Sequence, residues 1–376
     1  MIAQDEIREA LVGVIDPEIR RSVVELDMVR GVDVTGAHVD VTIALTVAGC
    51  PMKADLEHQV QERVGAVAGV ESVGVTFDVM TPAERTALRT RLQGAGGGEA
   101  PAAGGKKPIT LPPTASVIAV ASGKGGVGKS SLTANLAASL AAGGAEVGVI
   151  DADIYGYSIP RMLGISQRPV VVDGMIVPPV SNGIKIMSIG FFVDADAAVL
   201  WRGPMLHRAL EQFLTDVYWG DIDHLVVDMP PGTGDVAISL GQLLPSPQLV
   251  LVTTPQKAAQ AVAKRAAEVA DKTGMRLTGV IENMSYAVCS CCGERTHPFG
   301  QGGGAELASD LNTDLLGQVP LDERLRECGD SGEPLVISQP DSPAAVAITD
   351  IAATLADRLA PKIPAATRIK RPLTVL

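Results

Sequence analysis

Residues 123–130, GKGGVGKS, constrain this chain more than any other feature because they match the pattern G-x-x-x-x-G-K-[ST]. Residues 116–121, SVIAVA, come directly before them and predict a buried strand, and residues 130–142 predict a helix. A strand, a glycine-rich loop and a helix in this order form the context in which such a loop binds phosphate groups. An ordinary glycine-rich turn is the alternative, and the flanking segments disfavour it.

The residue types in this loop suit phosphate chemistry. Glycines let backbone N–H groups converge on phosphate oxygens, and the helix N-terminus adds its positive dipole end. The pattern predicts that Lys129 reaches the β- and γ-phosphates and that the Ser130 hydroxyl binds Mg²⁺. A second lysine inside the loop, Lys124, would stabilise transition-state charge, and a surface lysine without a role is the alternative. The predicted nucleotide-binding residues here are Gly123, Lys124, Gly125, Gly126, Val127, Gly128, Lys129, Ser130 and Ser131.

Composition and charge exclude several classes of protein. The 376 residues give room for two or three domains, and the net charge of −12 disfavours broad nucleic-acid binding because it repels phosphate backbones. The acidic start, MIAQDE, lacks a signal-peptide core, and no apolar run approaches the roughly 20 residues of a membrane span. Five cysteines, three of them clustered, do not resemble a disulfide framework. We therefore expect a cytoplasmic protein that binds neither nucleic acid nor a membrane.

A break in composition divides the chain in two. Residues 93–113 are rich in Gly, Ala and Pro and predict a flexible linker between residues 1–92 and 114–376. Residues 1–92 read as a small α+β domain. Its expected elements are a helix at 3–13, hairpin strands at 32–34 and 39–47, a helix at 51–67, a strand at 70–79 and a helix at 82–92 capped by Thr81.

The second part of the chain alternates strands with helices. We expect strands at 146–150, 224–227, 248–253, 276–281 and 316–320, and helices at 204–218, 256–273 and 342–360. This alternation predicts an α/β fold, a doubly wound, mostly parallel sheet with helices on both faces. Ligands of such sheets bind beyond the carboxyl ends of the strands, which is where the following acidic residues fall.

Acidic residues end two of the predicted strands. Asp228 follows the apolar run LVV and is expected to steady Mg²⁺ and its waters, and a helix-capping acid is the alternative. The turn at 229–235, MPPGTGD, is a candidate switch that responds to the γ-phosphate. Asp151 and Asp153 follow another strand. One of them would hold a Mg²⁺-bound water and the other would orient the attacking water, with a solvated turn as the alternative.

A cysteine cluster, CSCCG at 289–293, is the second strong signal. Cys289 and Cys292 form a C-x-x-C pair, and Cys291 adds a third thiol between them. This spacing suits half of a zinc site, a redox pair or half of an iron–sulfur site. A zinc site that takes His297 as its fourth ligand and a thiol redox pair are the alternatives to an iron–sulfur site.

The two other cysteines are single residues far from this cluster. Cys50 lies where a strand is followed by a helix, a position that favours a reactive or ligating thiol, and a small buried hydrophobic residue is the alternative. Cys328 is interpreted as core or surface filler. Four thiolates for one cluster would therefore come most simply from two chains, which predicts a symmetric dimer with the metal on its twofold axis.

Together these motifs resemble one family. Lys124 in the loop is similar to the deviant Walker A sequence of the nitrogenase-iron-protein and MinD/ParA class. The C-x-x-C after ENMS narrows the resemblance to the Mrp/ApbC iron–sulfur cluster carriers, called Nbp/Ind in eukaryotes, over about residues 114–360. Residues 1–92 resemble the small PaaD/SufT-like domain through DPE at 16–18 and T-x-x-G-C-P at 46–51.

The resemblance implies a homodimer that hydrolyses ATP with Mg²⁺, binds a bridging [4Fe–4S] cluster through Cys289 and Cys292, and passes the cluster to apoproteins. Its implied partners are apo iron–sulfur proteins and cluster-assembly scaffolds. Lys124 would contact the phosphates bound in the partner subunit, and Asp153 would act in a switch. The remaining implied roles are the Mg²⁺ site for Ser130, Asp151 and Asp228, and positions near the adenine for Pro255 and Asn283.

Two other functions remain as alternatives. A MinD/ParA-type positioning ATPase would need a basic or amphipathic surface element, and the chain offers only a short basic stretch at 368–376. A nucleotide-binding scaffold with a structural zinc site is the other. The chain departs from the family pattern at Cys291, whose thiol would compete with those of the cysteine pair.

Overall fold

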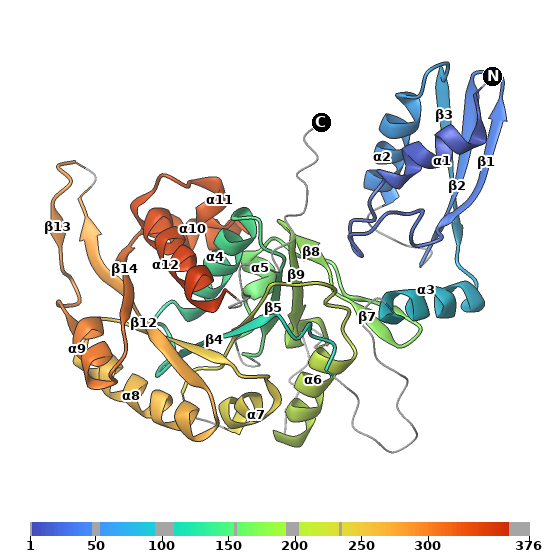
Figure 1. Ribbon diagram of the computed structural model, residues 1–376. Coiled ribbons are helices and arrows are strands. Elements are labelled where there is room, and N and C mark those ends of the chain that lie inside the picture. Colours follow the sequence, from blue (N-terminus) through green and yellow to red (C-terminus); the bar gives the residue numbers. More distant parts are fainter. Residues whose placement is uncertain are drawn as a thin grey trace, which may run out of the picture.

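A computed structural model describes residues 2–46, 53–94, 109–153, 156–192, 203–232, 235–289 and 291–360. Their strands form a small sheet near the N-terminus, a large sheet and a short hairpin (Figure 1). The basic stretch at 368–376 and most of the predicted linker lie outside the described residues. None of the described helices combines the length and apolar character that crossing a bilayer requires.

The small sheet belongs to the N-terminal α+β unit and follows the order β1–β2–β3. Strands β1 and β2 are antiparallel, and β3 pairs parallel to β2. The predicted Thr81 cap is present, since the Glu84 backbone N–H donates to Thr81 Oγ1 over 3.3 Å and the Thr81 N–H donates to Glu84 Oε2 over 2.6 Å. The elements are α1 (Gln4–Val12), β1 (Val29–Thr35), β2 (His38–Leu45), α2 (Lys53–Gly65), β3 (Ser72–Val79) and α3 (Pro82–Gly94).

The large sheet of the described residues follows the order β13–β12–β11–β4–β10–β5–β9–β8, and β14 pairs with β12. All its pairings are parallel except those of the terminal strands β8 and β13. The doubly wound, mostly parallel sheet is therefore confirmed. Its strands are β4 (Ser116–Ser122), β5 (Val147–Asp151), β8 (Val180–Ser181), β9 (Ile184–Ser188), β10 (His224–Asp228), β11 (Gln248–Thr253), β12 (Arg276–Val288), β13 (Arg295–Thr296) and β14 (Leu315–Leu321).

Helices cover both faces of this sheet because buried strand residues alternate between two cores. Val117 and Ala119 of β4 face one core with α6, α7, α8 and α9, whereas Ile118 and Val120 face the other with α4, α5, α10, α11 and α12. The helices are α4 (Lys129–Ala142), α5 (Ile159–Met162), η1 (Ile189–Phe192), α6 (Gly203–Thr215), α7 (Asp235–Leu243), α8 (Lys257–Lys272), α9 (Gly303–Asp310), α10 (Glu323–Ser331), α11 (Leu335–Ser338) and α12 (Pro343–Leu359).

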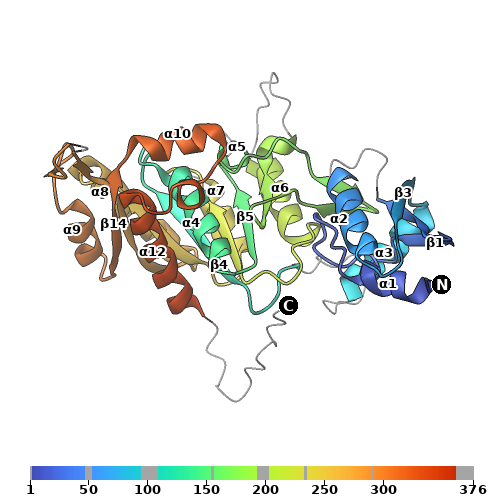
Figure 2. The same ribbon diagram turned by 90° about the horizontal axis from the view of Figure 1, so that it is seen from above.

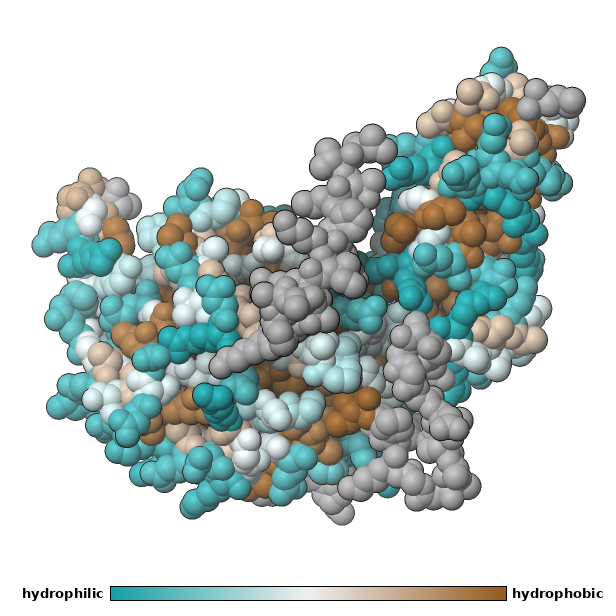
Figure 3. All heavy atoms as spheres, in the orientation of Figure 1, coloured by the Kyte–Doolittle hydropathy of each residue, from teal (hydrophilic) through white to brown (hydrophobic). Residues whose placement is uncertain are grey.

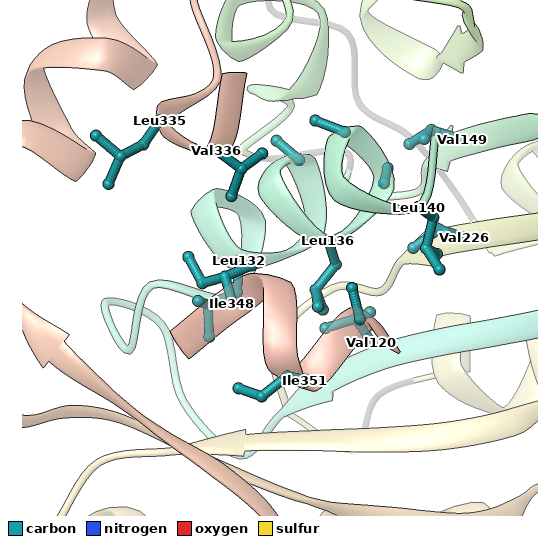
Figure 4. Packing of buried hydrophobic residues seen from close by; sticks show 14 of the residues in the cluster. Val120, Leu132, Leu136, Leu140, Val149, Val226, Leu335, Val336, Ile348 and Ile351 are labelled. Carbon is teal, nitrogen blue, oxygen red and sulfur yellow. The ribbon is translucent and has the colours of Figure 1, made fainter. Parts of the chain in front are cut away.

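The second core fixes α4, the helix that follows the glycine-rich loop. Leu132, Leu136 and Leu140 of α4 pack against Ile348 and Ile351 of α12 and against the sheet (Figure 4). Since these leucines recur every four residues, they form one buried stripe of the helix. The packing holds the first turn of α4 at the carboxyl end of β4. On the face shown in Figure 3, hydrophilic residues cover most of the surface and hydrophobic ones lie between them in small groups.

A hairpin of β6 (Val170–Val172) and β7 (Met175–Val177) joins the two units. Val172, Met175 and Val177 are buried in the same core as the N-terminal helices and strands. The Arg89 guanidinium donates to the Asp173 carbonyl over 2.7 Å. Figures 1 and 2 show that this N-terminal unit and the β12–β13 hairpin lie at opposite ends of the molecule.

Glu18 lies at this junction, beside a cavity of about 110 Å³ that Gln167 and Arg168 also line. Burial, and next the charge of the neighbouring Asp16 carboxyl, raises the pKa of Glu18 from 4.5 to about 7. The folded chain thus holds the proton more tightly than the unfolded chain does. Glu18 therefore costs stability as pH rises from about 4.5 to about 7, and the cost is constant above that window.

We expect Glu18→Gln to stabilise the fold progressively relative to wild type between pH 5 and pH 8, because glutamine does not ionise. Chemical denaturation of both proteins at the two pH values measures the difference. Glu25→Gln, a change at an exposed carboxyl of the same unit, serves as the control and should show no such trend. A gain in stability of Glu18→Gln that is the same at both pH values would contradict the raised pKa of Glu18.

Candidate functional site

The sheet brings the predicted motifs to one edge. Strand β10 lies between β4 and β5, and all three are parallel, so their carboxyl ends point the same way. In the register of these strands Asp228 is paired with Asp151 on one side and with Val120 on the other. The glycine-rich loop leaves β4 at this edge. Residues nearly 80 positions apart are thereby placed around one site.

The glycine-rich loop has a backbone that favours glycine at two positions. Gly126 and Gly128 have φ values of +80° and +82°, in the left-handed region. Gly128 also faces the Asn283 amide so closely that a Cβ would collide with it. Lys129 is the first residue of α4, so the loop ends at the positive end of that helix dipole. This is the arrangement that binds phosphate through backbone N–H groups.

Asp228 is the centre of a buried polar cluster at the start of α4. The Lys129 Nζ lies 2.7 Å from Asp228 Oδ2, and the two side chains are 6% and 0% exposed. The Ser130 hydroxyl donates to Asp228 Oδ2 over 2.7 Å, and the Thr133 hydroxyl donates to Asp228 Oδ1 over 2.8 Å. Thr133 was not predicted from the sequence. Its position four residues after Lys129 on one helix face was the available signal.

This cluster fits a magnesium ion. A carboxylate and a hydroxyl are hard oxygen ligands, and the buried Asp228 carboxylate lies beside a loop built for phosphates. Ser130 and Asp228 would hold the ion, while Lys129 can exchange its contact with Asp228 for a phosphate oxygen. The sequence prediction that names these three residues is consistent with the geometry, and their roles stay predictions.

Asp151 and Asp153 lie at the end of β5, the strand that pairs with β10 next to Asp228. Asp151 Oδ2 accepts hydrogen bonds from the backbone N–H groups of Ser158 and Ile159 over 3.1 and 3.2 Å, which orders the chain leading into α5. Burial, and next the charge of Asp228, raises the pKa of Asp151 to about 7. Asp153 Oδ2 lies 4.0 Å from Lys129 Nζ, so Asp153 borders the site. The magnesium and switch roles of these two acids stay predictions.

Lys124 and Pro255 lie at the rim of the loop. The Lys124 ammonium donates over 3.2 Å to Oε1 of Gln256, which occupies the N-cap position of α8. The carbonyl of Pro255 accepts from the Gln260 amide over 3.0 Å, so Pro255 is part of the same α8 start. Its predicted place near an adenine receives no direct support here, because Pro255 is not among the residues that line the cavity described next.

A cavity of about 360 Å³ adjoins the loop. The Asn283 amide, which is 1% exposed, donates to the Val127 carbonyl over 2.8 Å and so joins the cavity wall to the loop. The walls combine apolar and polar side chains, as pockets for small organic ligands do. They are formed by Gly128, Ser131, Met162, Asn283, Met284, Pro320, Leu321, Asp322, Leu325, Arg326, Gly329 and Asp330. Of these residues, Gly128, Ser131 and Asn283 were predicted from the sequence to bind the nucleotide, whereas the wall residues of β14 and α10 were not.

The cysteine cluster lies at the tip of a hairpin formed by β12 and β13. Cys289, Cys291 and Cys292 are exposed and form no disulfide. Backbone N–H groups of Cys292 and Cys291 donate to the Cys289 sulfur and lower the pKa of that thiol. The turn therefore favours the thiolate form that binds metals.

The remaining metal-binding candidates that the structure describes are not gathered around this tip. The His297 Nδ1 lies 3.2 Å from the Ser285 carbonyl, at the base of the hairpin. In the part of the chain that the structure describes, no three His, Cys, Asp or Glu residues are placed to hold a metal ion together. Cys328 is buried in the second core, which is one of the two positions, core or surface, that the sequence analysis gave for it. Cys50 lies outside the described residues.

Comparison with models of known protein families identifies the family of each part of the chain. Residues 114–356 match the family model described as NUBPL iron-transfer P-loop NTPase. The chain belongs to this family. Residues 4–77 match a second model, described as iron-sulfur cluster assembly protein. The resemblances predicted for both parts of the sequence are thereby confirmed.

Three curated relatives of this P-loop NTPase share the description iron-sulfur cluster carrier protein. The protein from Mycobacterium leprae is 48% identical over 359 residues, which are 94% of this chain and 92% of that protein. The one from Bacillus subtilis is 42% identical over 85% of this chain and 89% of its own length. The one from Escherichia coli is 50% identical over 249 residues, 66% of each chain.

Solved structures agree on the fold of the NTPase part. A nucleotide-binding protein from Archaeoglobus fulgidus in complex with ADP is 37% identical, with a TM-score of 0.53 over 60% of this chain and 89% of that one. The septum site-determining protein MinD of Pyrococcus horikoshii, complexed with Mg-ADP, is 25% identical, with a TM-score of 0.50 over 66% of this chain and 100% of that one.

Proposed function

We propose that this chain is an ATP-hydrolysing iron–sulfur cluster carrier that holds a [4Fe–4S] cluster between two copies of itself and transfers it to apoproteins. The observation that carries the proposal is the exposed Cys289 and Cys292 pair at the tip of a hairpin that belongs to the nucleotide-binding sheet. A buried structural metal site would enclose its ligands, whereas these thiols are open to a second protein.

The phosphate loop would perform the hydrolysis. Its backbone N–H groups and Lys129 bind the β- and γ-phosphates, and Ser130 and Asp228 hold Mg²⁺. Bound Mg²⁺ neutralises charge that develops on the phosphates. Asp153 orients the attacking water, and Lys124 of one copy reaches the phosphates held by the other. The base occupies the cavity beside Asn283.

The cysteine pair would receive the cluster as cargo. One pair supplies two thiolates, and a [4Fe–4S] cluster takes about four, so two copies share one cluster across a twofold axis. A cluster at an exposed tip is accessible to an acceptor, which suits release to apo iron–sulfur proteins and loading by an assembly scaffold. Exposed thiols of this kind persist in a reducing compartment such as the cytoplasm.

Anaerobic reconstitution with iron and sulfide tests this function. We expect about four irons and four sulfides per dimer, with dimer formation and metal loading rising together. Size-exclusion chromatography coupled to light scattering gives the mass of the loaded species. A strictly monomeric protein that holds its full metal complement would contradict the proposal, as would a zinc ion that resists exchange for iron and sulfide.

A further inference from the structure

Glu282 is a buried carboxylate that the nucleotide and metal sites described above do not use. It is 0% exposed and lies on β12, directly before Asn283. Three groups donate hydrogen bonds to it: the Ser285 hydroxyl, the Gly304 backbone N–H and the Gln318 amide, the last over 2.8 Å. A buried carboxylate that loses such donors costs folding free energy. The three hydrogen bonds therefore hold the Glu282 side chain in one position.

The three donors come from segments around the cysteine hairpin and around the cavity beside Asn283. Ser285 belongs to the part of β12 that leads out to the cysteines, and Gly304 lies in the first turn of α9, where the chain returns from them. Gln318 lies on β14, two residues before Pro320 of the cavity wall. The Glu282 side chain therefore connects β12 and the start of α9, which precede and follow the cysteine hairpin, to β14. Strand β14 borders the cavity beside Asn283.

Between this anchor and the tip, the hairpin is held together by side chains. The Arg295 guanidinium stacks 4.4 Å from the ring centre of Tyr286, and the rings of Tyr286 and His297 lie 6.4 Å apart, edge to face. The His297 Nδ1 also lies 3.2 Å from the Ser285 carbonyl. These contacts connect the base of the hairpin to the turn that carries the cysteines.

We propose that Glu282 is the positioning residue that couples occupation of the nucleotide cavity to the placement of Cys289 and Cys292. A ligand in the cavity contacts Asn283 and the end of β14, and the Glu282 carboxylate transmits their displacement to both ends of the hairpin. The inference rests on the proposed function and assigns the coupling of its two sites to one side chain.

Glu282→Gln tests the coupling. Glutamine keeps the size of the side chain but replaces one acceptor oxygen with an NH₂ group, so the backbone N–H of Gly304 or a side-chain donor loses its partner. In apo, full-length protein we expect Mg-ADP to change the iodoacetamide alkylation rate of Cys289 and Cys292 about fivefold or more in wild type. The variant should bind Mg-ADP and show nearly equal rates with and without it.

Two further variants make the result decisive. Glu306→Gln makes the same chemical change at an exposed position of α9 and should keep the wild-type response. Ser285→Ala removes a single donor and should weaken the response even if Glu282→Gln does not fold. A wild-type response in Glu282→Gln, or thiol rates in wild type that ignore Mg-ADP, would overturn the inference. The reconstitution experiment judges the carrier function independently of both outcomes.

Discussion

Lys129→Ala is expected to lower ATP turnover by about 100-fold or more, because it removes the cation that the loop directs at the transferring phosphate. The Lys129 ammonium is buried, and its contact with Asp228 at 2.7 Å holds it inside the site. No other cation of the described residues lies within 4.0 Å of Asp228 in an ion pair. Steady-state phosphate release measures the loss.

The control for this variant is Lys264→Ala, at an exposed lysine of α8 that pairs with Asp310. It should retain wild-type turnover. Since removing one partner of a buried ion pair costs about 3–5 kcal/mol of stability, thermal unfolding of Lys129→Ala must be recorded as well. Ser130→Ala leaves the charges in place and should also depress turnover, through weaker Mg²⁺ binding. Turnover above a tenth of wild type in both site variants would contradict the assignment of the loop.

Local patterns were sufficient to place the candidate phosphate-site residues at one sheet edge, because these residues follow parallel strands. Each strand that ends in a glycine-rich loop or an acid delivers that group to the same sheet edge, so Lys129, Asp151 and Asp228 could be brought together before their contacts were known. Asn283 was located by resemblance, and the structure joins it to the loop through Val127. Most strands of both sheets were predicted at least in part, but β9, whose sequence IKIMS is also apolar and alternating, was missed.

Features that depend on distant partners could not be predicted in this way. Strand β12 was expected to end at residue 281, because Glu282 looks like the polar end of an apolar run. The strand in fact continues to Val288, since Gly304 and Gln318 satisfy the buried carboxylate. Strands β6 and β7 have three residues each, too few for an alternating pattern to be recognised.

Cys289→Ala and Cys292→Ala are each expected to abolish cluster binding while ATP hydrolysis survives at least in part. Each variant leaves one thiolate of the C-x-x-C pair per chain, and therefore two thiolates of that pair in the proposed dimer, which is half of the usual ligand set of a cubane cluster. The turn that carries the cysteines lies beyond the last β12–β13 strand pair, so removing one of its thiols should leave the phosphate site unchanged. Iron and sulfide analysis after anaerobic reconstitution, with phosphate release measured on the same samples, tests both halves of the prediction.

Cys291→Ala is the matched control, because it removes an equally exposed thiol from the same turn while leaving the C-x-x-C spacing intact. It should load a full complement of iron and sulfide. Loss of the cluster in Cys291→Ala would instead make the middle thiol a ligand. If Cys289→Ala or Cys292→Ala still binds as much iron and sulfide as wild type, the pair is not the cluster site, and the exposed hairpin serves another purpose.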